Sequence, residues 1–121
     1  METKEQKTLL QKIKLTEVES LNIAQKYYSL LSAIGNSTLT EREIQLVAFT
    51  AIKGNISYSS NREEFCTLYK SSSPTINNII SKLKKLNFLI KDAGKIKVNP
   101  ALLLDFDKGV TLQISIDKQN G

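Results

Sequence analysis

The strongest constraint on the fold is a helix pattern that leads directly into a hairpin pattern. Ser73-Pro74 places a capping hydroxyl before a proline at the first helical position, where proline is favoured. The apolar residues that follow recur every three or four positions: Ile76, Ile79, Ile80, Leu83 and Leu86. A strand pattern then follows at residues 88–91, a tight turn at 92–94 and an alternating strand pattern at 95–98. The region predicts an amphipathic helix over 74–86 and a β-hairpin.

The N-terminal part of the chain predicts another amphipathic helix, over residues 16–34. Its apolar residues recur at spacings of three and four, and Thr16 with Glu19 has the pattern of a capping box. Gly35-Asn36 is the expected stop. Residues 1–15 have mixed charge with interspersed leucines, and a helical arm and a frayed tail fit them equally well.

The next segment predicts a helix with a well-marked start. Thr40 and Glu43 occupy the two positions of a capping box, and Gly54 supplies a left-handed stop after Lys53. Residues 55–60 are mainly polar and predict a short extended piece. Asn61 is then expected to cap a short helix that ends before the serine turn.

The length and apolar content favour one domain. A chain of 121 residues with 40% hydrophobic residues can bury one compact core, expected over 16–116 with its central part at 39–100. Residues 110–116 alternate apolar and polar positions and predict a strand with one buried face. Residues 1–15 are expected to form an N-terminal arm, either ordered or mobile, and residues 117–121 are expected to form a tail. The predicted class is mainly α with a small β-hairpin, α+β.

Positive charge is concentrated in one part of the chain. The formal net charge is +5, yet residues 70–97 contain seven lysines against the single acid Asp92, which gives +6 there and −1 for the remainder. Such a concentration favours contact with an anionic partner.

The composition argues against an enzyme. The chain has no histidine and one cysteine, Cys66, so neither a histidine-based triad nor a structural zinc cluster is available. Cys66 itself is expected to be a small core residue. The acid pairs fit helix starts and loop solvation, because no nucleophile or phosphate-loop motif accompanies them: Glu41/Glu43, Glu63/Glu64 and Asp105/Asp107. We expect no enzymatic activity, no cofactor and no metal.

No apolar run approaches the length of a membrane span, and the N-terminal residues lack the apolar stretch of a signal peptide. A cytoplasmic protein without membrane contact is expected, in the host cytoplasm or in a virion if a phage encodes it. Lysine supplies 15 of the 17 basic residues, a bias typical of AT-rich bacterial, plasmid or phage genomes.

Four segments carry a family resemblance: 39–43 (LTERE), 64–69 (EFCTLY), 72–76 (SSPTI) and 83–90 (LKKLNFLI). With their order of helix, extended piece, helix, turn, helix and hairpin, they resemble the winged-helix superfamily, particularly MarR-like regulators and small plasmid or phage replication initiators. The resemblance covers about half of the chain. Asn87 stands where the family often has glycine, and residues 70–72 replace its glycine-containing turn. The resemblance implies a winged helix with an extra N-terminal helix and a C-terminal strand.

The resemblance implies that helix 74–86 is a recognition helix in the DNA major groove and that residues 92–97 form a wing. Asn77 and Asn78 would form paired hydrogen bonds with adenine, while lysines would neutralise phosphates. Four to six such lysines imply a logarithmic salt slope of about −4 to −5. The candidate DNA-binding residues are Ser73, Thr75, Asn77, Asn78, Ser81, Lys82, Lys85, Lys95 and Lys97.

The sequence therefore predicts a protein that binds duplex DNA, either a transcriptional regulator or a replication accessory factor. The alternative is a protein-interaction or assembly module, such as a phage structural component, without a specific DNA site. Residues 16–34 and 110–116 are the surfaces expected to mediate self-association or to bind a protein partner.

Overall fold

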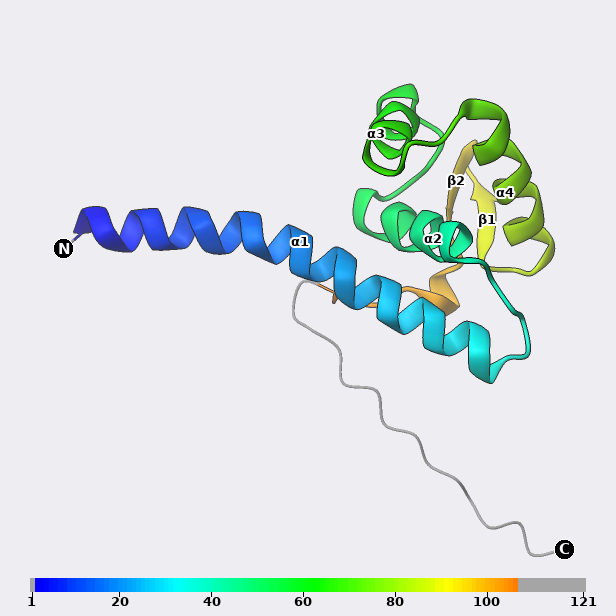
Figure 1. Ribbon diagram of the computed structural model, residues 1–121, viewed down its shortest axis with the longest axis horizontal. Coiled ribbons are helices and arrows are strands. Elements are labelled where there is room, and N and C mark those ends of the chain that lie inside the picture. Colours follow the sequence, from blue (N-terminus) through cyan, green and yellow to red (C-terminus); the bar gives the residue numbers. More distant parts are fainter. Residues whose placement is uncertain (1, 107–121) are drawn as a thin grey trace, which may run out of the picture.

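The computed structural model describes the backbone of residues 2–106 and the side chains of residues 18–106. Within these residues the chain forms four α-helices, one two-stranded antiparallel sheet and the short 3-10 helix η1 (Pro100–Leu102). The described part is mainly helical with a small β-hairpin, an α+β arrangement as predicted (Figure 1). The predicted strand 110–116 and tail 117–121 lie outside the described residues.

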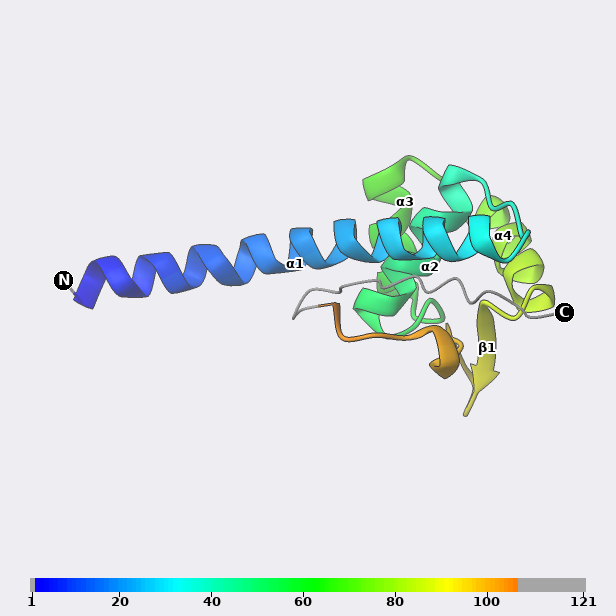
Figure 2. The same cartoon turned by 90° about the horizontal axis from the view of Figure 1, so that it is seen from below.

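Helix α1 (Glu2–Ile34) is longer than the sequence pattern indicated. The predicted start at Thr16 is wrong, because the helix passes through this position. Residues 2–15 contain neither glycine nor proline, so nothing in them interrupts a helix. The predicted stop is confirmed, with Asn36 in the left-handed region at φ 57°. The N-terminal half of α1 projects beyond all the other elements (Figures 1 and 2).

Helix α2 (Glu41–Lys53) begins and ends where its caps predict. The Thr40 hydroxyl accepts a hydrogen bond from Glu43 N at 3.2 Å, and Glu43 Oε1 accepts one from Thr40 N at 2.8 Å. At the other end Gly54 adopts φ 96°, a conformation that side chains rarely allow. The capping box and the glycine stop are both confirmed.

Helix α3 (Ser59–Tyr69) follows a short extended piece, but the predicted cap at Asn61 is wrong. Asn55 Oδ1 accepts hydrogen bonds from the backbone N–H groups of Ser57 and Tyr58, and this turn lets the helix begin three residues earlier, with Tyr58 at the cap position. Asn61 lies inside the first turn, where its amide donates to the Asn55 carbonyl at 2.9 Å.

Helix α4 (Ser73–Lys85) begins one residue before the predicted start. Ser72 occupies the cap position in place of Ser73, and Pro74 is in the first turn. The Ser72 hydroxyl is 2.9 Å from the Thr75 hydroxyl and forms no cap bond to backbone. After the helix, Asn87 adopts φ 65°, so asparagine takes the left-handed conformation that otherwise favours glycine.

The predicted hairpin is present. Strands β1 (Leu89–Asp92) and β2 (Lys95–Val98) pair in antiparallel register, with Leu89 opposite Val98 and Asp92 opposite Lys95. The turn residues Ala93 and Gly94 both have positive φ, at 51° and 78°. Two left-handed residues match the twist of the flanking strands, which explains the tight connection.

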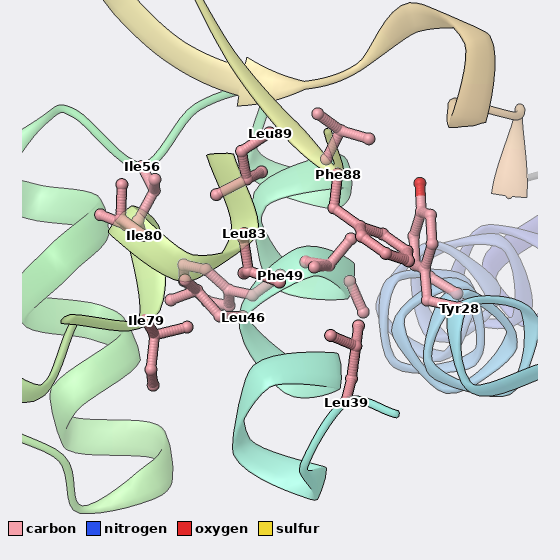
Figure 3. Close-up of a cluster of buried hydrophobic side chains, with 14 of the residues drawn as sticks. Tyr28, Leu39, Leu46, Phe49, Ile56, Ile79, Ile80, Leu83, Phe88 and Leu89 are labelled. Atoms are coloured by element: carbon pink, nitrogen blue, oxygen red, sulfur yellow. The ribbon is translucent and has the colours of Figure 1, made fainter. Parts of the chain in front are cut away.

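One hydrophobic core joins the elements (Figure 3). Phe49 of α2 and Phe65 of α3 are buried and meet edge to face with centroids 5.4 Å apart. Side chains from α4 and β1 point into the same cluster, among them Ile80, Leu83 and Leu89. Cys66 packs partly buried against this core, in agreement with its predicted role.

The last described residues return to α1. The fully buried Tyr28 donates its hydroxyl proton to the Leu102 carbonyl at 2.9 Å, and its ring is 5.7 Å from that of Phe106. Burial raises the pKa of the Tyr28 phenol well above its usual value, with a further rise from the neighbouring Tyr27. These contacts attach α1 to the segment that follows the hairpin.

Candidate nucleic-acid interface

Helix α4 presents two chemically different faces. Its apolar stripe is buried in the core: Ile76, Ile79, Ile80 and Leu83. The remaining side chains from Ser73 to Lys85 are exposed. At 3.6 residues per turn, Pro74, Asn78, Ser81 and Lys85 form the middle of the exposed face. The core thus fixes the orientation of a polar and basic helix surface.

The candidate residues on α4 are all at the surface, as a DNA-contacting role requires. The exposed candidates are Ser73, Thr75, Asn77, Asn78, Ser81, Lys82 and Lys85. Two of them, Asn77 and Lys82, flank the middle of the face and bond to other helices. The exposed face therefore contains residues with and without intramolecular partners.

Lys82 pairs with the capping glutamate of α2. Its Nζ lies 2.9 Å from Glu43 Oε1, and the exposed fractions of the two side chains are 45% and 9%. Burial by itself would raise the pKa of the Glu43 carboxyl, but the hydrogen bond from the Thr40 backbone and the pair with Lys82 together hold this pKa below its usual value. In the free protein Lys82 therefore connects α4 to α2, and a phosphate would have to compete with Glu43 for it.

Asn77 is hydrogen-bonded to α3. Arg62 Nη1 donates to Asn77 Oδ1 at 2.8 Å, while Arg62 Nε donates to the Ile56 carbonyl at 2.9 Å. Sequence reasoning missed Arg62. One signal for it was available, since only two of the 17 basic residues are arginines and arginine is favoured where one side chain must donate in two directions.

The two hairpin lysines share one face, as predicted from their spacing. Lys95 and Lys97 alternate with inward-facing residues of β2, and the register places Asp92 opposite Lys95. Lys95 Nζ is 5.1 Å from the centroid of the Tyr58 ring, and Lys97 Nζ is 3.7 Å from Asp92 Oδ2. Both lysines are half-buried, so the hairpin positions them more firmly than a free loop would.

The hairpin is tied by hydrogen bonds to the extended piece between α2 and α3. Ile56 N donates to the Ile96 carbonyl at 3.0 Å, and Ile96 N donates to the Ser57 hydroxyl at 2.7 Å. Since Arg62 holds the Ile56 carbonyl, one chain of hydrogen bonds runs from β2 through residue 56 to Arg62 and Asn77. The hairpin and α4 are thereby fixed relative to each other.

Lys84, Lys85 and Lys91 are exposed and make no ion pair with any described residue. Among the side chains that the structure describes, no cluster of three or more metal-ligating residues occurs. No helix in residues 2–106 combines the length and apolarity that crossing a membrane requires.

Comparisons with known protein families, curated proteins and solved structures found no match.

Proposed function

We propose that this chain is a winged-helix DNA-binding protein that reads duplex DNA with the exposed face of α4 and holds the backbone with its hairpin. The order of elements supports this proposal: α2, the extended piece tied to β2, α3, α4 and then the hairpin. A transcriptional regulator and a replication accessory factor both fit this activity.

The observation that carries the proposal is the exposed middle of α4. Asn78 and Ser81 offer hydrogen-bond donors and acceptors, and Lys85 follows one turn later on the same side. Amide side chains at such positions pair with base edges, and the lysine suits the flanking phosphate. A helix with one face locked in a core and the other rich in such groups can enter a major groove about 12 Å wide.

The ion pairs revise the expected salt dependence. With Lys82 held by Glu43 and Lys97 near Asp92, the lysines best placed to meet phosphate are Lys84, Lys85, Lys91 and Lys95. At roughly −0.9 for each neutralised phosphate, four lysines give a logarithmic salt slope of about −3.6. This is shallower than the sequence alone indicated.

Fluorescence anisotropy with labelled random and AT-rich duplexes at 50 and 200 mM salt tests the proposal. A slope of about −3.6 predicts that affinity falls about a hundredfold between these concentrations. Lys85→Ala should make the slope shallower by about 0.9, whereas the matched control Lys85→Arg retains the charge and the slope. Absence of binding at 50 mM salt would refute the proposal.

A groove between α1 and α2 favours a second candidate function, binding to a second copy of this chain. The groove has a volume of about 660 Å³ and is lined by Gln25, Lys26, Ser29, Leu30, Ala33, Glu41, Ile44 and Gln45. It carries one basic and one acidic residue, Lys26 on α1 and Glu41 at the start of α2. A twofold axis would place Lys26 of each copy against Glu41 of the other copy, as a self-complementary interface requires.

Charge exchange tests this self-association. Light scattering on the wild type should give the mass of a dimer, and Lys26→Glu should lower the dimer fraction. Lys26→Glu combined with Glu41→Lys should restore it, because the two charges then exchange places. A wild type that stays monomeric at about 100 μM would rule out the groove as a dimer interface.

A further inference from the structure

We infer that Arg62 is a positioning residue that fixes the base preference of Asn77, directing it towards guanine and away from adenine. This inference rests on the proposed DNA-binding function and assigns specificity within the same site. It revises the interpretation of Asn77 and Asn78 as equivalent readers of adenine.

The contact with Arg62 determines which way the Asn77 amide faces. A guanidinium group has only donors, so the Asn77 atom that it meets at 2.8 Å must be the carbonyl oxygen. The amide nitrogen Nδ2, which carries two protons, is then the group turned away from Arg62. The bond thus resolves the amide orientation that side-chain shape alone would leave open.

The orientation of Asn77 selects among bases. Paired recognition of adenine needs both ends of the amide, with the oxygen accepting from the adenine N6 amino group. Here the positively charged Arg62 guanidinium already donates to that oxygen, so the partially positive hydrogen of the adenine amino group would be repelled by the neighbouring guanidinium. Guanine presents the acceptors N7 and O6 in the major groove, which suit the outward-facing donor of Asn77.

Arg62 is itself held in place. Its Nε donates to the carbonyl of the buried Ile56, and Ile56 N donates to Ile96 of the hairpin. The guanidinium therefore bridges a fixed backbone atom and the Asn77 side chain. A lysine at this position would keep the charge, but its single ammonium lacks the fork needed to donate to both oxygens in this geometry.

Asn78 provides an internal control on the same helix. It is exposed, and its side chain has no hydrogen-bond partner among the described residues. Both ends of its amide can face a base, so the paired adenine contact stays assigned to Asn78. The two neighbouring asparagines are thus predicted to read different bases.

Selection from a randomised duplex library, followed by sequencing of the bound pool, tests the inference. The wild type should favour guanine at one position and adenine at another. Arg62→Lys and Asn77→Ala should each weaken the guanine preference about tenfold, and the double variant should lose no more than either single variant. Asn78→Ala should weaken only the adenine preference. Since Arg62→Lys retains its charge, its salt slope should equal that of the wild type.

The outcomes separate this inference from the function on which it rests. A wild type that binds DNA with a motif, but whose guanine preference survives Arg62→Lys, overturns the positioning role alone. Loss of an adenine preference in Asn77→Ala also overturns it. A wild type that enriches no motif overturns the proposed sequence reading and this inference together. Thermal unfolding of each variant shows that the compared proteins are folded.

Discussion

Lys82 and Lys85 lie on the same helix, one turn apart, yet the structure predicts that they act differently. Lys82 Nζ is 2.9 Å from the carboxylate of Glu43, whereas Lys85 is exposed without such a partner among the described residues. Substitution of each by methionine removes the charge and preserves an unbranched stem with a similar helix propensity. The pair Lys82→Met and Lys85→Met is therefore a matched comparison.

The expected loss of stability in Lys82→Met follows from the burial of Glu43. A hydrogen bond between charged groups contributes about 1.5–3 kcal/mol when well protected, but Lys82 is 45% exposed, and screening by solvent reduces this contribution to about 1 kcal/mol. The Glu43 side chain is 9% exposed, and its carboxylate would then keep only its interactions with Thr40. For a domain of this size, about 1 kcal/mol lowers the melting temperature by about 4 °C.

Two assays separate the roles. Thermal unfolding should place Lys82→Met about 4 °C below the wild type and Lys85→Met close to it. Salt-dependent anisotropy on duplex DNA should show the reverse, with the slope changed by about 0.9 only in Lys85→Met. A double-mutant cycle between Lys82→Met and Glu43→Gln should give a coupling free energy of about 1 kcal/mol.

A Lys82→Met variant that melts like the wild type and makes the salt slope shallower by about 0.9 would contradict these assigned roles. That result would mean that Lys82 meets phosphate and that its pair with Glu43 contributes little. A coupling near zero in the cycle would lead to the same conclusion.

Three further predictions concern stability. Because the folded pKa of Glu43 is lowered, the stabilisation of the folded state by the Glu43 carboxylate is complete above the ordinary value of 4.5 and is lost as the pH falls through the folded pKa. Glu43→Gln should remove this pH-dependent part of the free energy of unfolding, measured with urea between pH 7 and 3. An unchanged pH profile in the variant would contradict the assignment. Phe49→Ala should cost about 3–5 kcal/mol, since the ring is 1% exposed and packs on Phe65; a loss below about 1 kcal/mol in denaturant unfolding would show that the core is loose there. Tyr28→Phe should cost about 1 kcal/mol by deleting the bond to the Leu102 carbonyl, with faster amide exchange near η1 as the accompanying sign, and equal exchange in both proteins would argue against the bond.

Much of the secondary structure could be predicted because its causes are local. The capping box of Thr40 and Glu43, the stop at Gly54 and the turn at Ala93-Gly94 each depend on residues within a few positions of one another. The left-handed conformation of Asn87 likewise has a local cause. The errors were also local: where two polar residues compete for one cap, as Ser72 does with Ser73, the pattern does not decide between them.

The extent of α1 could be predicted only in part. Its sequence shows where a helix is possible and where it stops, but not whether residues 2–15 join it, because mixed-charge segments are compatible with both states. The exposed face of α4 was predictable, since the periodicity of its apolar residues determines which positions are buried.

The sequence by itself determined the capping box and glycine stop of α2, the hairpin, the amphipathic helices and the concentration of positive charge. Only the tertiary structure decided which charged and polar groups are engaged. Lys82 reaches Glu43 across 39 positions, and Arg62 reaches Asn77 across 15. Such partners are chosen by the packing of helices around the core, which brings together side chains whose spacing in the sequence carries no signal. That packing changes the expected roles of Lys82 and Asn77.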